Sequence, residues 1–280
     1  MPPTIETNAL HPGIVIPEQV GPLIVQPVDR MSVAMQVSRV VETASPTFRL
    51  PLVLDDVSAS WVAEGAEIAE DSPVTDEEIV TPVKLAALTI VSSELANDSS
   101  PDAAQVVGQS IARNLARQID LAYFGSAVGL APNGLGNLTG INAVDAGAAW
   151  TDLDAFAEAI NHADSEGREI TAFVTSPADA LALAVLKDQT DSNRPLLGTA
   201  LEGTRRMALG VPVWVSPGVP EGVVYGLPQD VSMVVRRADI SLVVDRSRWF
   251  ERDSVGIRAT MRVGFSWPHA ASVQKISLTA

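Results

Sequence analysis

The chain of 280 residues contains no cysteine and only three histidines. The absence of cysteine excludes disulfide bonds, thiolate nucleophiles and cysteine-ligated zinc. The histidines, His11, His162 and His269, are far apart in the sequence, and nothing in their spacing points to a metal site. The sequence therefore predicts neither a metal nor another cofactor.

Long apolar stretches are also missing. The longest runs from Leu181 to Leu186, far short of the ~20 residues that cross a bilayer. The N-terminal residues Met1 to Thr4 lack the basic and apolar regions of a secretory signal. We therefore expect a soluble protein that is intracellular in origin and has no membrane partner.

Basic residues are scarce, with 19 Lys and Arg against 34 Asp and Glu and a net charge of −15. This balance argues against a general nucleic-acid-binding protein, because phosphate neutralisation needs clustered basic side chains. A hydrophobic content of 46% with only 19% charged residues excludes a disordered chain. The charge is also uneven: residues 50–83 hold nine acids and no base, whereas residues 228–280 hold eight bases and five acids. Such a distribution predicts a head-to-tail contact between copies.

The first half of the chain predicts extended structure followed by one long helix. Six prolines between positions 2 and 27 indicate an extended arm over residues 1–35. Alternation predicts strand within residues 33–54, beginning with Val33, Met35 and Val37, and a returning strand at 84–92, so that the acidic segment 50–83 forms a long hairpin. Ser100 and Pro101 predict the start of a helix over 101–124 with one apolar stripe.

The second half predicts an α/β unit and a long closing strand. Thr151 and Ser176 are candidate N-caps of two helices, which end near Glu166 and Lys187, and strands follow at 211–215 and 223–225. Strict alternation from Val255 to Phe265 predicts a strand about twice the usual length. A helix and a strand of this length are typical of a flat, elongated body rather than of a pocket enzyme.

Three groups of side chains are candidates for chemistry or contact. The acids Asp55-Asp56 and Asp76-Glu77-Glu78 are interpreted as a solvated loop rather than as catalytic or metal-ligating groups. Trp61, an aromatic residue among acids, is either an interface anchor or packed on its own hairpin. Arg113 and Arg117, one turn apart on the long helix, either face packaged nucleic acid or form an ordinary exposed surface or inter-subunit ion pair.

The order of these parts, together with several short motifs, resembles the major capsid proteins of tailed phages, which have the Hong Kong 97-type fold. The residues that carry the resemblance cover about 210 positions and include these segments: Trp61-Val62-Ala63-Glu64-Gly65, Lys84-Leu85-Ala86 through Ser92-Ser93-Glu94-Leu95, Gln118-Ile119-Asp120-Leu121-Ala122, Pro132-Asn133-Gly134-Leu135, Gly210-Val211-Pro212-Val213 and Arg262-Val263-Gly264.

The resemblance implies an α+β capsid fold with four parts. Residues 1–35 would be the N-terminal arm, and residues 50–83 the extended E-loop hairpin. Residues 36–49, 84–149 and 228–268 would form the peripheral domain, with its spine helix at 101–124. Residues 150–227 and 269–280 would form the axial domain.

The implied function is that of a structural shell protein of a double-stranded DNA bacteriophage, not an enzyme. Its partners would be copies of itself in hexamers and pentamers of an icosahedral virion, separate scaffolding and portal proteins, decoration proteins, and packaged DNA held without sequence specificity at the inner face. Assembly would take place in the host cytoplasm. The residues expected at contacts between subunits are Trp61, Glu64, Glu67, Glu70, Asp71, Arg246, Arg248, Arg252, Arg258 and Arg262.

Two other functions remain as alternatives. An encapsulin-type nanocompartment would have the same fold, but its cargo-binding N-terminal helix does not suit the proline-rich arm. A soluble metal-dependent α/β enzyme would use the paired acids. The only lysines are Lys84, Lys187 and Lys275, outside the hairpin, so a covalent lysine–asparagine cross-link between subunits is not expected.

Overall fold

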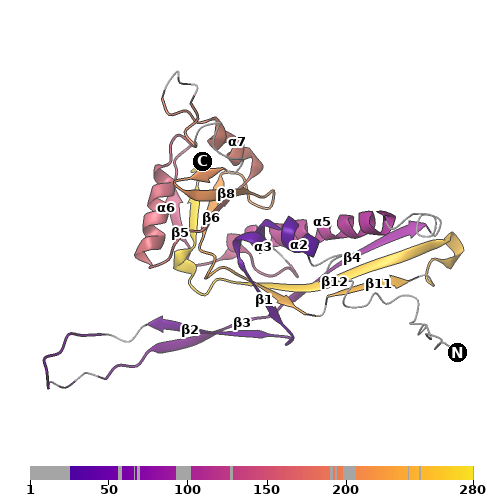
Figure 1. Ribbon diagram of the computed structural model, residues 1–280, viewed down its shortest axis with the longest axis horizontal. Helices are drawn as coiled ribbons and strands as arrows, with labels where there is room; N and C mark the ends of the chain where they lie inside the picture. Colours follow the sequence, from indigo (N-terminus) through magenta and orange to yellow (C-terminus); the bar gives the residue numbers. More distant parts are fainter. Residues whose placement is uncertain are drawn as a thin grey trace, which may run out of the picture.

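The computed structural model describes residues 26–55, 59–65, 67, 70–92, 102–126, 129–189, 192, 194–197, 206–238, 240–245 and 247–279. These residues form two units built around separate sheets and a two-stranded hairpin that projects from them (Figure 1). The expected arm falls largely on residues 1–25, which lie outside the described residues.

The first unit is a five-stranded sheet organised around β12 (Ser254–Ser266). On one side β12 pairs along ten residues with β4 (Val83–Ser92). On the other side its first half pairs with β11 (Ser241–Asp245) and its last residues pair with β10 (Met233–Arg237), which is joined in parallel by β1 (Arg39–Thr43). The predicted long strand over 255–265 is confirmed.

Helix α5 (Asp102–Phe124) lies along this sheet (Figure 1) and confirms the helix predicted over 101–124. Its buried stripe includes Ile111, Leu115 and Ile119, which join one apolar core with Ala259 and Met261 of β12. The helix is about 35 Å long at 1.5 Å per residue. Helix and strand therefore cover each other over most of their lengths.

The second unit is a six-stranded sheet in the order β5, β13, β9, β6, β8, β7. The strands are β5 (Asn142–Asp145), β6 (Ala172–Thr175), β7 (Met207–Ala208), β8 (Val211–Val215), β9 (Val223–Leu227) and β13 (Gln274–Ser277). Its helices, α6 (Asp154–Ser165) and α7 (Pro177–Val185), pack on a second apolar cluster containing Phe156, Phe173 and Leu183. Strand β5 joins this sheet although it precedes residue 150, where the unit was expected to begin.

One of the two predicted N-caps is correct. Ser176 caps α7, its Oγ accepting a hydrogen bond of 3.1 Å from the Asp179 backbone N–H, and the helix ends two residues before the expected Lys187. Thr151 does not cap α6, because the helix begins at Asp154 and the side chain of Asp152 accepts from the Asp154 N–H instead.

The strand expected to begin at Val33 is wrong. Residues 26–37 form two short helices, α2 (Gln26–Met31) and α3 (Val33–Val37), and the strands begin only at Arg39. Alternating apolar residues in so short a run do not distinguish strand from helix. The helical conformation is stabilised by a residue distant in the sequence, because the Asp120 carboxylate accepts hydrogen bonds from the N–H groups of Val33 and Ala34 at the start of α3.

The long hairpin exists, but its partner strands differ from those expected. Strand β2 (Phe48–Asp55) pairs with β3 (Val74–Val80), which lies inside the segment read as loop. Residues 84–92 do form a strand, β4, but it pairs with β12 and not with β2. The sequence of β3, Val-Thr-Asp-Glu-Glu-Ile-Val, hides its strand character because neither face is apolar.

Candidate inter-subunit contact surfaces

The β2–β3 hairpin extends away from both units (Figure 1), and most of β3 is exposed on both faces, while Leu50 and Leu52 of β2 are half-buried. Val53, Val74 and Ile79 are each about half exposed. A two-stranded sheet without a covering layer is at best marginally stable in water. The hairpin therefore offers apolar surface that the described residues leave uncovered.

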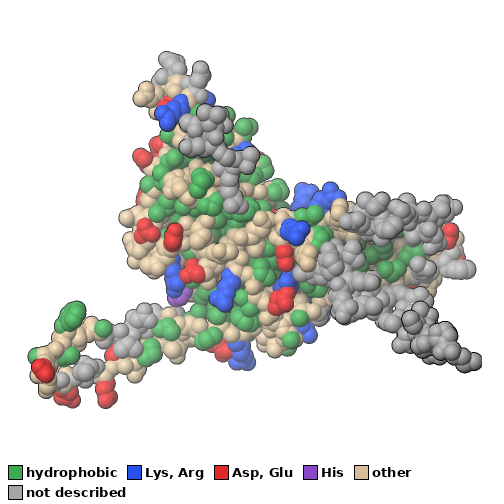
Figure 2. Space-filling model, viewed as in Figure 1, with side chains coloured by type: hydrophobic (Ala, Val, Ile, Leu, Met, Phe, Trp, Pro, Cys, Tyr) green, Lys and Arg blue, Asp and Glu red, His purple; other side chains and the backbone are tan. Residues whose placement is uncertain are grey.

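The segment that joins the two strands carries the side chains expected to make contacts. The Trp61 ring is fully exposed at 105% of its reference area, and Val62 is 46% exposed. This exposure contradicts the alternative in which Trp61 packs on its own hairpin. Glu64, Glu67, Glu70 and Asp71 are exposed in the same segment, and Figure 2 shows acidic side chains beside hydrophobic ones at this end of the molecule.

The base of the hairpin is fixed to the end of β12. Glu78 Oε2 accepts a 2.7 Å hydrogen bond from Ser266 Oγ, and Val80 is buried. A Cβ at Gly264 would lie 2.7 Å from Val80 Cγ1, so only glycine allows this approach. Farther out, Arg49 and Glu77 form an exposed ion pair at 3.2 Å. These contacts set the direction in which the hairpin leaves the body.

The predicted arginines are distributed along β12 and the β11–β12 connection. Arg246 lies outside the described residues. Arg248 stacks on Trp249 with its Cζ 5.4 Å from the ring centroid, and Arg252 is exposed in the short helix η3 (Phe250–Arg252). Arg258 is exposed in β12, and Arg262 lies opposite Lys84 of β4 and is half-buried.

The outer face of the first sheet also exposes apolar side chains, which the sequence analysis missed. Leu88 and Ile90 of β4 are 59% and 52% exposed. Beside them lies a groove lined by Val243, Trp249 and Arg258. The sequence of residues 84–92 indicates an exposed apolar face, because its apolar residues fall on both faces of the strand. A strand with one solvated face would show polar residues there.

The outward face of α5 carries Arg113 and Arg117, both exposed. Their neighbours on that face are Ser110, Asn114 and Gln118. Among the described side chains of α5 the only acid is Asp120, which is buried at 5% exposure. In a strongly acidic chain, this face is locally positive.

Asp120 joins three segments of the chain, a role that sequence reasoning did not identify. Its carboxylate accepts from Ser32 Oγ at 2.6 Å, from the backbone N–H groups of Val33 and Ala34, and from Ser216 Oγ at 3.4 Å. Burial raises the pKa of Asp120, and these hydrogen bonds oppose the rise. The carboxylate thus holds α3 and the turn after β8 against α5.

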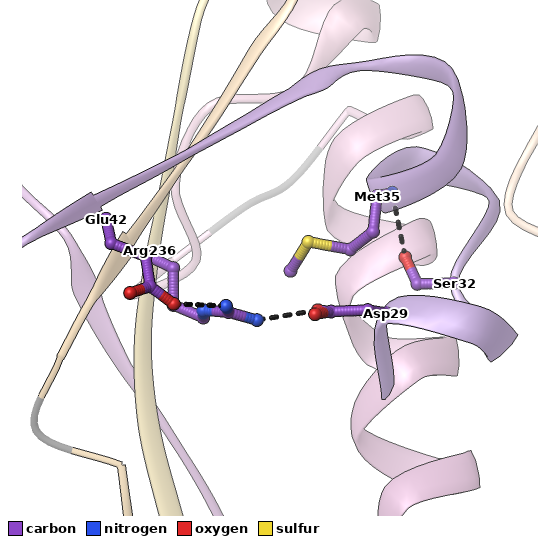
Figure 3. Close-up of polar contacts among 5 residues, drawn as sticks. All are labelled: Asp29, Ser32, Met35, Glu42 and Arg236. Atoms are coloured by element: carbon purple, nitrogen blue, oxygen red, sulfur yellow. Dashed lines mark hydrogen bonds and ion pairs between the residues drawn. The ribbon is translucent and has the colours of Figure 1, made fainter. Parts of the chain in front are cut away.

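A second polar cluster, centred on a buried arginine, fixes α2 to the first sheet (Figure 3). The Arg236 side chain, 7% exposed, donates to Asp29 of α2 at 2.6 Å and to Glu42 of β1. Burial acts to lower the pKa of Arg236, but its hydrogen bonds with Glu42 and Asp29 outweigh that effect and raise it. In the sequence, Glu42 and Asp29 are 194 and 207 residues from Arg236, so no local pattern could reveal these pairs.

Within the described residues, no three His, Cys, Asp or Glu side chains are close enough to hold a metal ion. Of the paired acids, Glu77 is paired with Arg49 and Glu78 accepts from Ser266. None of the helices in the described part of the chain is long and apolar enough to cross a membrane.

Comparisons with known proteins agree with this geometry. Solved structures with the same fold include the capsid of a native GTA particle, computed with C5 symmetry, at 20% identity and a TM-score of 0.70, covering 100% of this chain and 95% of that one. A chain of Mycobacterium phage Adephagia gives 16% identity and a TM-score of 0.71 over 89% and 90% of the two chains. The virus-like particle from Pyrococcus furiosus gives 12% and 0.60 over 93% and 98%.

A search of curated protein sequences finds no significant match. The sequence model described as the phage capsid family, however, matches residues 12–278, almost the whole chain. The fold is therefore the Hong Kong 97-type capsid fold, and this chain belongs to the phage capsid family.

Proposed function

We propose that this protein is the major shell subunit of a tailed double-stranded DNA phage and assembles through hexamers and pentamers into an icosahedral capsid. The observation that carries the proposal is the family match over residues 12–278. The capsid of the native GTA particle, computed with C5 symmetry, has the same fold and supports a shell function here. The protein acts as a building element of the virion and not as an enzyme.

In this proposal each part of the chain has a place in the shell. The β2–β3 hairpin is the E-loop, α5 is the spine helix of the peripheral domain, and the six-stranded sheet with α6 and α7 is the axial domain. The arm that reaches a neighbouring subunit is limited to residues before α2, because residues 26–35 belong to α2 and α3, which are held on the body of the same chain. Scaffolding, portal and decoration proteins are the further partners, and assembly takes place in the host cytoplasm.

The hairpin makes the main heterologous contact. Its tip combines an exposed Trp61 and Val62 with Glu64, Glu67 and Glu70. The outer face of the first sheet combines exposed Leu88 and Ile90 with Arg248 and Arg258. In Figure 1 the hairpin and the β11–β12 connection point toward opposite ends of the molecule. Apolar and charged groups on the two surfaces are complementary, which favours contact between successive copies.

The positive face of α5 is the surface proposed to meet the packaged genome. Arg113 and Arg117 are exposed one turn apart, with uncharged polar neighbours. Non-specific DNA binding rests on phosphate neutralisation and weakens steeply with salt. Two arginines per subunit are a weak site alone, but a shell repeats them many times.

The test is electron microscopy of the purified full-length chain beside sedimentation, over a range of salt and protein concentrations, with and without added double-stranded DNA. Closed shells, or rings of five and six subunits, are the expected result. A monodisperse monomer or dimer under every condition would overturn the proposal. Shells purified from cells that hold a protein cargo and no nucleic acid would instead establish the encapsulin-type alternative.

Replacement of three acids at the hairpin tip tests the contact itself. The variant Glu64→Lys, Glu67→Lys, Glu70→Lys places like charges opposite the arginines and is expected to prevent shell formation. Restoration of shells by the added changes Arg248→Glu and Arg258→Glu would identify the partner surface. Normal particles from the lysine variant would exclude this pairing.

A further inference from the structure

The carboxylate of Asp120 is shared by two serine side chains from distant parts of the chain. Ser32 lies between α2 and α3, and Ser216 begins the turn that follows β8 of the second unit. The two serines are 88 and 96 residues from Asp120 in the sequence. All three residues are buried, Asp120 at 5% exposure and both serines at 0%. Asp120 is therefore the point at which α5, the segment 26–37 and the second unit meet.

The four hydrogen bonds to Asp120 use the acceptor sites of both carboxylate oxygens. Oδ1 accepts from Ser32 Oγ at 2.6 Å and from the Ala34 N–H at 3.0 Å. Oδ2 accepts from the Val33 N–H at 3.1 Å and from Ser216 Oγ at 3.4 Å. Each carboxylate oxygen has two lone pairs, so the carboxylate has one donor for each lone pair. One oxygen, Oδ2, thus serves α3 and the second unit together.

Each serine hydroxyl also fixes the backbone of its own segment. Ser32 Oγ accepts from the Met35 N–H at 3.3 Å and so caps α3. Ser216 Oγ accepts from the Gly218 N–H at 3.2 Å within the turn after β8. In both cases one hydroxyl accepts from a backbone amide and donates to Asp120, and hydrogen bonds in such a chain strengthen one another. The geometry of both segments therefore depends on the position of one carboxylate.

The turn after β8 packs directly on the backbone of α5. A Cβ at Gly218 would lie 2.6 Å from the backbone oxygen of Asp120, so only glycine allows this approach. The same turn is tied to the second sheet, because the Ser216 N–H donates to the backbone oxygen of Thr175 in β6 at 3.0 Å. Val219 at the end of the turn is buried in the main core. A displacement of the second sheet therefore reaches Asp120 through this turn.

The segment 26–37 has one anchor in the first unit and one that it shares with the second. Helix α2 is held by the ion pair of Asp29 with Arg236 of β10 in the first sheet, whereas α3 is held by Asp120. The segment joins residues 1–25 to β1, and β1 is followed by the hairpin strand β2. The shared anchor thus lies between the two parts of the chain that are proposed to reach neighbouring copies.

From these contacts we propose that Asp120 couples the attachment of α3 to the position of the second unit, so that a change at the turn after β8 loosens α3. Loss of the Ser216 hydrogen bond leaves a buried acceptor site empty and weakens the network that also holds Val33 and Ala34. Asp120 acts here as a positioning residue. The coupling is a property of the single subunit, so it can fail while the proposed shell function stands.

Amide hydrogen exchange of the full-length chain, below the concentration at which it assembles, measures the coupling in both directions. In Ser216→Ala, the Val33 and Ala34 amides are expected to exchange about fivefold faster, although both donate to Asp120 and not to Ser216. Coupling between two sites is reciprocal. In Ser32→Ala, the Val219 N–H, which donates to the backbone oxygen of Ser216, is therefore expected to exchange faster by a similar factor.

The matched control is Ser176→Ala, which changes another buried serine of the second unit. Ser176 caps α7 and hydrogen-bonds to Asp179, so its loss is expected to loosen α7 and to leave exchange at Val33 and Ala34 unchanged. Asp120→Asn is the second control, because asparagine offers one acceptor oxygen in place of two. In that background, Ser216→Ala is expected to have no further effect on the exchange of α3.

Three outcomes would overturn the proposal. Unchanged exchange of α3 in Ser216→Ala would show that the turn and α3 are independent, and equal acceleration in Ser176→Ala would show a general loosening of the second unit. Acceleration in one direction only would contradict the reciprocity. If Ser216→Ala does not fold, the exchange of Val219 in Ser32→Ala decides the question. Failure of the wild-type chain to form shells would remove the proposed function and leave this coupling as it stands.

Discussion

Two antiparallel strand pairs of this protein, with ten and seven paired positions, have opposite environments. The β4–β12 pair lies under α5, and one face of each strand contributes to the main core, including Met261 and Val263. The β2–β3 pair projects from the body, and most of β3 is exposed on both faces. The first pair has its covering layer within the chain, whereas the described residues supply none for the second. Substitutions in the body, including the base of the hairpin, should therefore change the stability of the subunit, and substitutions in the exposed part of the hairpin should change assembly alone.

The largest expected effect on stability is in the body, at Asp120. Asp120→Ala leaves two backbone N–H groups at the start of α3 without their acceptor in a buried site. We expect the free energy of unfolding to fall by about 3 kcal/mol, measured by urea denaturation. Glu70→Ala, at an exposed position of the hairpin, is the control and should leave the midpoint unchanged. Equal effects of the two changes would refute the distinction between body and hairpin.

The next prediction concerns the two tyrosines, which are the only ones in the chain. Burial raises the pKa of both Tyr123 and Tyr225 to about 12. The folded subunit thus retains these protons above pH 10, where the unfolded chain loses them. The contribution of the two tyrosines to the free energy of unfolding is fully present below pH 10 and is lost as the pH rises toward 12. Absorbance titration should show little phenolate at pH 10.5 without unfolding; half-ionised tyrosines there would contradict the buried sites.

An intermediate effect is expected where the hairpin joins the body. Gly264→Ala introduces a Cβ 2.7 Å from Val80 Cγ1, and we expect a loss of about 1–2 kcal/mol from overpacking. Val80→Ala makes room for the new methyl group, so the double variant should lose less than the sum of the two single variants. Calorimetry of the four proteins measures this coupling. Strict additivity would show that the two residues do not restrain each other.

The sequence was sufficient for the elements whose pattern is long and local. The apolar stripe of α5 extends over at least three helical turns, and the alternation of β12 over at least three pairs of residues. The ends of both elements were predicted to within one residue. The acidic strand β3 and the helices α2 and α3 were missed, because their conformation depends on partners elsewhere. The Ala34 N–H at the start of α3 donates to the Asp120 carboxylate, 86 residues away in the sequence. Asp29 of α2 is paired with Arg236, 207 residues away.

The exposed surfaces proposed as contacts were predictable only in part. Trp61 and the acids around it were predicted as contact residues, because an aromatic residue among charges is unusual in any context. Leu88 and Ile90 were not, since an apolar residue in a strand is expected to be buried, and only the fold shows which face is left open. Exposure is a property of the tertiary arrangement, so a pattern of residue types alone cannot supply it.

The smallest expected effect on stability is at the hairpin tip. Trp61→Ala removes a fully exposed ring, so the free energy of unfolding of the subunit should change by no more than about 0.5 kcal/mol. Assembly should nevertheless fall sharply, because an aromatic side chain buried at an interface often contributes much of its binding energy. Trp249→Ala, in contact with Arg248 within the body, is the comparison and should lower stability. A Trp61 variant that lost stability but assembled normally would reverse the roles assigned to the hairpin and the body.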